Sequence, residues 1–202
     1  MTIFEACVGN YEEAISAGKR GADRIELCDN LIEGGTTPSY GTIKKTLEKL
    51  DIPIMVIIRP RGGNFIYTKD EVEIMKYDIQ MCKDLGAHGV VIGAIKESKI
   101  DMDIIKELIS LANPLSITFH MAFDEIEDKY TAIDELIELK IDRILTKGGS
   151  EDAVAGKDII RELINYANGR ISIMPGKGVN SDNRDFILTY TGANEIHGSK
   201  VI

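Results

Sequence analysis

The stretch AGKRGADRIELC at positions 17–28 contains the unit from which the fold follows. Its polar first half reaches a glycine, a residue that commonly closes helices, and its second half is a short apolar run typical of a buried strand. Related phrases return as CKDLGAHGVVIG at 82–93, IELKIDRILTKG at 137–148 and LTYTGANEIHGS at 188–199. We therefore predict a repeating unit of helix, tight turn, strand and polar loop.

Strand-like runs occur eight times, at residues 3–7, 24–28, 54–58, 90–94, 115–120, 143–147, 171–174 and 195–197. Most intervals between them show helical spacing, with apolar stripes at 104–109 and 159–164. A capping box at Thr68 and Glu71 opens another stretch, whose apolar stripe includes Cys82. Strands that alternate with helices indicate a parallel sheet, and eight of them favour a TIM-type (β/α)8 barrel over a doubly wound sheet.

No linker, low-complexity tract or change of composition divides the chain, so we expect one TIM-barrel-like domain over residues 1–202. A typical barrel has about 250 residues and a helix after every strand. Here Ile202 comes just after the eighth strand-like run, and we expect a trimmed barrel that lacks the helix after its eighth strand. Apolar barrel surface left uncovered in this way usually meets a partner, so we expect a homo-oligomer, a dimer or a tetramer.

The composition excludes several classes of protein. Lys and Arg number 24 against 33 Asp and Glu, a net charge of −9, which disfavours binding to nucleic acid through a general positive field. No apolar run approaches the roughly 18 residues that span a membrane, and the first residues lack the basic and apolar parts of a signal peptide. Three cysteines are too few for a disulfide framework. We therefore expect a cytoplasmic protein.

Alternation along the strands predicts which side chains point into the barrel. Outward-facing residues must be apolar because helices cover them, so Ile25 and Leu27 face out and their neighbours face the lumen. The inward set obtained in this way is Glu5, Cys7, Glu26, Cys28, Arg59, Arg61, His120 and His197. Such charges lie late in their strands, where barrel proteins keep their sites. They indicate a functional pocket, and the alternative is a purely structural ion-pair network.

Cationic loops follow several of these strands. Arg59 and Arg61 stand beside Gly62 and Gly63, and arginine captures carboxylate or phosphate with two parallel hydrogen bonds. The alternative is that these arginines only neutralise lumen glutamates. Lys147 and Lys177 also lie in glycine-containing loops, and are further candidates for binding an anion unless those loops are plain turns.

Cys7 and Cys28 lie on adjacent predicted strands, each two residues after a lumen glutamate. Neighbouring strands are about 4.8 Å apart, so two thiolates could share one soft ion such as Cu(I). The alternative is that both are small buried hydrophobes, the interpretation we give to Cys82.

The sequence resembles the copper homeostasis protein CutC family. The resemblance rests on GADRIELC at 21–28, EGGTTPS at 33–39, IIRPRGGNFIYT at 57–68, TFHMAFD at 118–124, RILTKGG at 143–149 and EIHGS at 195–199. It implies a trimmed TIM barrel, a cytoplasmic oligomer and a role in copper handling. It also implies that Cys7 and Cys28 hold Cu(I), and this sequence departs from the family pattern at Met121, Lys147 and Gly198.

Two functions follow as hypotheses. The first is a copper homeostasis protein that binds Cu(I) through Cys7 and Cys28, with Met174 as an additional sulfur donor, and that needs no organic cofactor. The second is an enzyme acting on a small anionic or sugar-like molecule. Its candidate catalytic residues are Glu5, Glu26, His120 and Asp124, and its candidate ligand-binding residues are Arg59, Arg61, Lys147, Lys177 and His197. A variant of the enzyme hypothesis places Zn or Mn on Glu5, Glu26, His120 and His197. A third reading is an oligomeric scaffold with a vestigial pocket.

Overall fold

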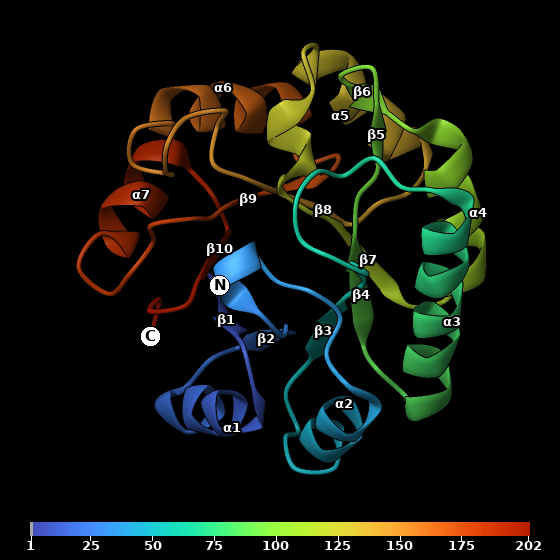
Figure 1. Cartoon of the computed structure of the whole chain (residues 1–202). Coiled ribbons are helices and arrows are strands. Elements are labelled where there is room, and N and C mark those ends of the chain that lie inside the picture. The colour runs from blue at the N-terminus through green and yellow to red at the C-terminus, as the bar shows by residue number, and fades with distance from the viewer. Residues whose placement is uncertain (1) are drawn as a thin grey trace.

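Eight parallel strands form a nearly closed barrel in the computed structural model, which describes residues 2–202 (Figure 1). The strands are β1 (Ile3–Val8), β2 (Arg24–Leu27), β3 (Ile54–Ile57), β4 (Gly89–Ile92), β7 (Ser116–Phe119), β8 (Arg143–Thr146), β9 (Ser172–Pro175) and β10 (Glu195–Gly198). Their spatial order is β10-β1-β2-β3-β4-β7-β8-β9. Strands β9 and β10 lie next to each other, but no backbone ladder joins them within residues 2–202. All eight predicted strands and the TIM-type barrel are therefore confirmed.

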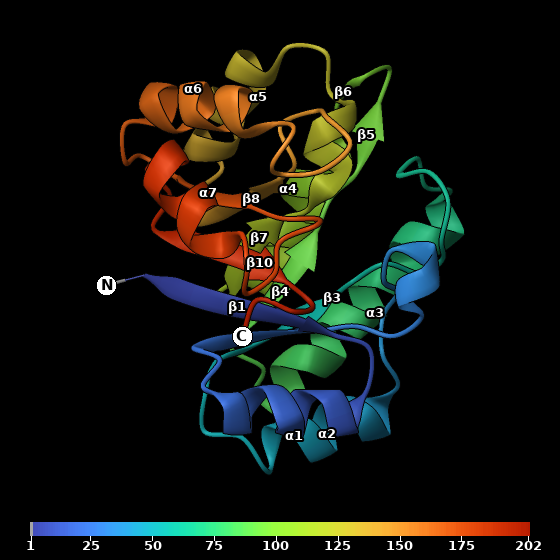
Figure 2. The same cartoon turned by 90° about the vertical axis from the view of Figure 1, so that its left-hand side faces the viewer.

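Helices surround the strands in a ring (Figures 1 and 2). They are α1 (Tyr11–Arg20), α2 (Tyr40–Leu47), α3 (Lys69–Leu85), α4 (Met102–Ala112), α5 (Lys129–Glu138), α6 (Lys157–Ala167) and α7 (Arg184–Thr191). The predicted glycine caps occur at Gly21, Gly86 and Gly192, each in the left-handed backbone conformation. In the third repeat Lys140 takes the left-handed conformation instead, with φ 59°. The capping box of Thr68 and Glu71 is present at the start of α3.

Four short elements were not predicted. The strands β5 (Ile95–Lys96) and β6 (Lys99–Ile100) pair as an antiparallel hairpin, and the 3-10 turns η1 (Leu31–Glu33) and η2 (Met121–Glu125) follow β2 and β7. Elements of two to five residues are too short to produce a readable hydrophobic period. The turns η1 and η2 are important for the site because both carry residues that line its cavity.

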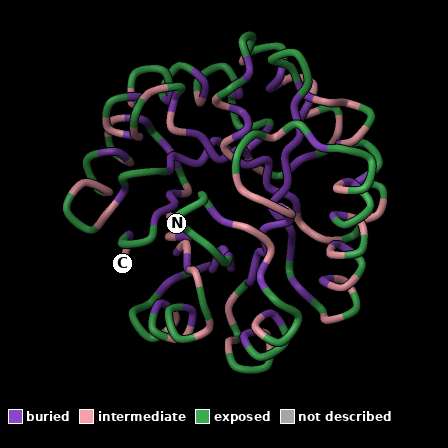
Figure 3. The backbone as a smooth tube through the Cα atoms, in the orientation of Figure 1, coloured by how far each residue is buried: buried purple, intermediate pink, exposed green. Residues whose placement is uncertain are grey.

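Inward and outward faces follow the predicted alternation. The outward residues Ile25, Leu27 and Phe119 are fully buried between strands and helices. A second, smaller apolar cluster lies inside the barrel and consists of Cys28, Met55, Ile57 and Val91, with Cys7 packed against it. The central strands are accordingly the most continuously buried part of the chain (Figure 3). The predicted α6 stripe is only partly correct, because Ile159 is exposed while Ile160 and Leu163 are buried.

The ring of helices has a gap between α7 and α1, and the C-terminal end of the chain lies there (Figure 1). Phe4 of β1 is partly buried and packs against the hydrophobic core. The guanidinium of Arg184 lies 4.6 Å from the centre of the Phe4 ring and donates to the carbonyl of Val201. Arg184 therefore covers part of the Phe4 ring and binds the backbone next to the end of the described chain.

Candidate functional site

A cavity of about 660 Å³ opens at the carboxyl ends of the strands. Its wall comes from the ends of β1, β2, β3, β8 and β10 and from the loops after β2, β3, β7, β9 and β10. The residues that line it are Cys7, Glu26, Leu31, Ile32, Glu33, Gly34, Ile57, Arg59, Phe65, His120, Met121, Leu145, Lys177, Gly178, Val179, Asn180, His197, Gly198, Ser199 and Lys200. This is the end at which barrel proteins keep their sites.

Glu5 lies below the cavity and links two neighbouring side chains, His197 and Arg24. The strand register places Glu5 beside both His197 and Arg24. One carboxylate oxygen lies 2.8 Å from Nδ1 of His197, and the other accepts a hydrogen bond from Arg24. Burial opposes ionisation, but these two partners outweigh it and lower the pKa of Glu5 to about 2. Both oxygens of Glu5 are thus occupied, which makes it a positioning group for His197.

A layer of ion pairs lies below Glu5, toward the amino ends of the strands. Arg24 also pairs with Glu195, and Nε of Arg143 lies 3.3 Å from the same carboxylate. Met174 is part of this layer, because its sulfur accepts a hydrogen bond from Arg24 at 3.4 Å. Met174, the expected additional sulfur donor, therefore has Arg24 as a hydrogen-bonding partner.

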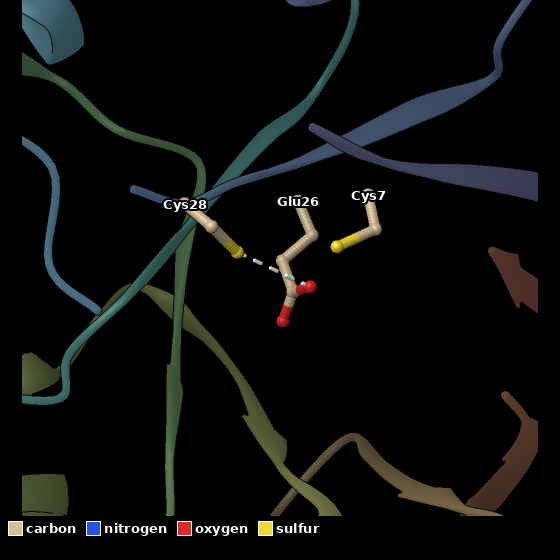
Figure 4. A group of neighbouring side chains, drawn as sticks. All are labelled: Cys7, Glu26 and Cys28. Atoms are coloured by element: carbon tan, nitrogen blue, oxygen red, sulfur yellow. Dashed lines mark hydrogen bonds between the residues drawn. The ribbon is translucent and has the colours of Figure 1, made fainter. Parts of the chain in front are cut away.

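Cys7, Glu26 and Cys28 form a compact group in the barrel (Figure 4). One donor atom from each lies within 4.8 Å of the other two, and it is the one group of three or more metal-ligating side chains found in residues 2–202. Glu26 is paired with Cys7 across the strands, and the Cys28 thiol donates to Oε2 of Glu26 at 3.5 Å. The expected proximity of the two cysteines is therefore present.

The three residues of this group differ in how readily they lose a proton. A hydrogen bond from Cys28 and the nearby His197 lower the pKa of Cys7 well below its usual range, although burial opposes this. The same hydrogen bond, together with burial, raises the pKa of Cys28. Burial and the negative charge at Cys7 raise the pKa of the Glu26 carboxyl. The arrangement favours one thiolate, one thiol and a neutral acid.

His197 joins Glu5 to the cysteine group. Its Nε2 lies 3.5 Å from Oε2 of Glu26, while its Nδ1 contacts Glu5. Burial disfavours its charged form, but Glu26, Cys7 and Glu5 outweigh burial and raise the pKa of His197 well above its usual value. The imidazolium therefore supplies a positive charge next to the Cys7 thiolate.

His120 lies in another part of the cavity wall and has the opposite character. Its Nδ1 accepts a hydrogen bond from the backbone N–H of Ala122 at 3.1 Å, which places the proton on Nε2. Burial and the nearby charge of Arg59 lower the pKa of His120 to about 3. Nε2 is buried and has no hydrogen-bond partner among residues 2–202. His120 is thus a neutral donor that lines the cavity.

Arg59 and Arg61, the two arginines of the 57–68 stretch, lie in different surroundings. Arg59 lines the cavity, but its guanidinium donates to the carbonyls of Glu33, Gly35 and Gly63. Arg61 does not line the cavity, contrary to the expectation that it faces the lumen. It pairs with Glu71 at 2.5 Å, because the chain has left β3 at this point and strand alternation no longer determines its direction.

The remaining predicted residues are Asp124, Lys147 and Lys177. Asp124 accepts hydrogen bonds from the Thr146 hydroxyl and from the backbone of Lys147, so it braces the loop after β8. Neither Asp124 nor Lys147 lines the cavity, whereas Lys177 does. The sequence reasoning missed Phe65 and Lys200 as lining residues. The aromatic residue after the glycine pair was a usable signal for Phe65, but nothing in the sequence marked Lys200.

Among residues 2–202, no helix combines the length and apolar character needed to cross a lipid bilayer.

The chain has counterparts among known proteins. The sequence profile described as the CutC family matches residues 2–202. A CutC family protein of Parabacteroides distasonis is 50% identical over 200 residues, which cover 98% of this chain and 82% of the relative. The human protein named copper homeostasis protein cutC homolog is 44% identical over 198 residues, which cover 98% of this chain and 72% of the relative.

Solved structures show the same likeness. The crystal structure of a CutC protein from Streptococcus agalactiae is 40% identical, has a TM-score of 0.95 and covers the whole of both chains. An aldolase has a TM-score of 0.73 at 13% identity, covering 98% of this chain and 90% of its own. At that identity the likeness concerns the barrel fold alone.

Proposed function

The chain belongs to the CutC family, and we propose that it binds copper as Cu(I) between Cys7 and Cys28. The observation that carries this proposal is the group of two thiols and one carboxyl whose donor atoms lie within 4.8 Å of one another. With a metal–thiolate bond of about 2.3 Å, the value for zinc, one ion between two sulfurs spans about 4.6 Å, close to that limit. Soft thiolate ligands favour Cu(I) among the common cellular metals.

The donors in the barrel fit a soft ion better than a hard one. Zn or Mn on Glu5, Glu26, His120 and His197 would need four free donors in one place. Glu5 is occupied by Arg24 and His197, and His120 is outside the metal-ligating group found among the described residues. The thiol pair is the donor set that the structure brings together.

Binding of the ion changes the protonation state of one residue, Cys28. Cys7 is already favoured as a thiolate, whereas the raised pKa of Cys28 favours its thiol. Formation of two sulfur–copper bonds therefore releases the Cys28 proton to solvent. The product, one Cu(I) with two thiolates, has a charge of −1, and the imidazolium of His197 beside Cys7 offsets it.

A cytoplasmic location and self-association belong to the same proposal. Cys7, Cys28 and Cys82 are all free thiols, the form that a reducing compartment maintains and that Cu(I) binding requires. A dimer or a tetramer would cover the partly exposed Phe4 ring, which lies beside the guanidinium of Arg184.

An anaerobic competition titration with a chromophoric Cu(I) chelator tests the metal site. We expect one Cu(I) per chain, and the Cys7→Ser/Cys28→Ser double variant should lose more than about 100-fold in affinity, beyond the usual cost of losing a merely supporting group. The matched control is Cys82→Ala, because Cys82 is buried in α3 away from the group. Unchanged affinity in the double variant would exclude this site.

Catalysis on a small anionic or sugar-like molecule is a second candidate function. One observation favours it: the cavity extends past the thiols to His120, a buried donor with no partner in the described residues. A Cu(I) site at Cys7 and Cys28 gives His120 no role. Steady turnover of such a molecule by copper-free protein would establish this function.

A further inference from the structure

The unpartnered Nε2–H of His120 is the feature of the cavity that copper binding leaves unexplained. His120 is 4% exposed, and its Nδ1 is already bonded to the backbone of Ala122. A buried donor without a partner destabilises the folded protein, because it has lost its hydrogen bonds to water. The unmet donor of His120 therefore indicates a ligand that supplies an acceptor.

The position of His120 is fixed from several sides. The centre of its ring lies 4.7 Å from that of Phe65, and the guanidinium of Arg59 lies 4.9 Å from the centre of the same Phe65 ring. Gly93 provides the space for the imidazole, since a Cβ there would lie 2.5 Å from Nδ1. The donor is therefore held in place before any ligand arrives, which lowers the cost of binding.

Positive charge gathers at the rim formed by the loops after β9 and β10. Lys177 and Lys200 line the cavity, are exposed, and form no ion pair within residues 2–202. A β-bridge between Asn180 and Lys200 joins the two loops. Lys177 has φ 68°, a conformation that is uncommon for a residue with a side chain and that often marks functional sites.

These two loops follow the seventh and eighth strands of the barrel, where barrel proteins frequently bind phosphate. Gly178 and Ser199 lie beside the lysines and line the same rim. The acid Glu33 also lines the cavity, but its side chain lies against Gly62 in the loop after β3. The volume of about 660 Å³ is that of an ordinary small-molecule site.

We propose that this cavity binds a small phosphomonoester of a sugar or polyol, with its phosphate between Lys177 and Lys200 and one hydroxyl or carbonyl oxygen accepting the Nε2–H of His120. Phe65 provides the apolar surface on which the carbon chain rests. The inference gives a substrate class to the second candidate function and rests on it only for turnover. Binding of the phosphomonoester does not depend on copper, because Lys177, Lys200 and His120 are not part of the group formed by Cys7, Glu26 and Cys28.

Calorimetric titration of copper-free protein with D-ribose 5-phosphate, D-ribose and inorganic phosphate tests the proposal. We expect ribose 5-phosphate to bind at least about tenfold more tightly than ribose or phosphate alone, since each added contact of 1.4 kcal/mol gives a factor of ten. His120→Phe keeps an aromatic ring in the stack and removes the donor, and should lower the affinity about tenfold.

The double variant Lys177→Ala/Lys200→Ala changes only exposed side chains and should bind ribose 5-phosphate no better than ribose. Lys147→Ala is its matched control, because Lys147 lies in a neighbouring loop but does not line the cavity. Three results would overturn the proposal: no saturable binding of ribose 5-phosphate at millimolar concentration, an affinity indifferent to the lysine pair, or inorganic phosphate binding equally well. Cu(I) titration of the same variants shows whether the copper site survives independently.

Discussion

Glu5 is the residue on which the two polar layers of the barrel depend. Its carboxylate contacts His197 on the side of the cavity and Arg24 on the side of the strand amino ends, and it is almost completely buried. Removing one member of a buried ion pair leaves its partners uncompensated, at a cost of about 3–5 kcal/mol. Glu5 is therefore a stabilising residue first, and it affects the site by holding His197 near Cys7.

The Glu5→Gln variant should be less stable than the original protein by a pH-dependent amount. The pKa of Glu5 falls from 4.5 to about 2 on folding, so the folded state holds fewer protons between these values. The stabilisation is complete above pH 4.5 and is lost as the pH falls toward 2. Urea denaturation across this range should show a gap of about 3–5 kcal/mol near neutrality that narrows in acid. A gap of constant size would contradict the ion-pair assignment.

The helix α3 shows how one element also shapes the rim of the site. Thr68 accepts from the backbone N–H of Glu71, and the Glu71 carboxylate accepts from the backbone N–H of Thr68. The same carboxylate pairs with Arg61, which in turn bonds the carbonyls of Gly62, Asn64 and Ile66. The start of α3 thus orders the loop that presents Phe65 to the cavity.

Replacing the cap should destabilise the protein without removing the barrel. Thr68→Ala removes the acceptor for the Glu71 N–H and should lower the free energy of unfolding by about 1 kcal/mol. Thr68→Ser keeps a hydroxyl and should cost far less. Chemical denaturation of both variants provides the comparison, and equal losses for alanine and serine would show that the cap hydrogen bond is not what stabilises α3.

At the scale of the whole molecule, the notable feature is the open place in the helix ring between α7 and α1 (Figure 1). Arg184 covers the Phe4 ring only in part. A partly exposed aromatic ring of this kind is a candidate for contact with another protein surface. A second copy of the chain is the occupant that we expect there.

Light scattering of the purified protein should give a mass of two or four chains. Phe4→Glu places a charge at this partly buried position and should shift the mass toward one chain. Ile159→Glu is the control, since Ile159 is an exposed apolar residue of α6, and it should leave the mass unchanged. A single-chain mass for the original protein would refute the expected oligomer.

The sequence by itself determined the barrel and the face of each strand. Apolar runs that alternate with helix signals are compatible with few other arrangements. Alternation within a strand places Glu26 inward because Ile25 and Leu27 face the helices, and places Glu5 and Cys7 inward because Phe4 faces outward. These conclusions depend on local order along the chain, which the sequence contains directly.

Only the tertiary structure decided which inward residues meet. The register between β1, β2 and β10 joins Glu5 to His197 and brings Cys7 to Glu26, while His120 stands apart with a free donor. Arg61 bonds carbonyls of its own loop and Asp124 bonds the backbone of the loop after β8, because residues outside strands follow hydrogen bonds to nearby backbone rather than strand alternation. The position of an inward side chain along the barrel axis and the path of a loop depend on contacts between distant segments. No local sequence pattern encodes those contacts.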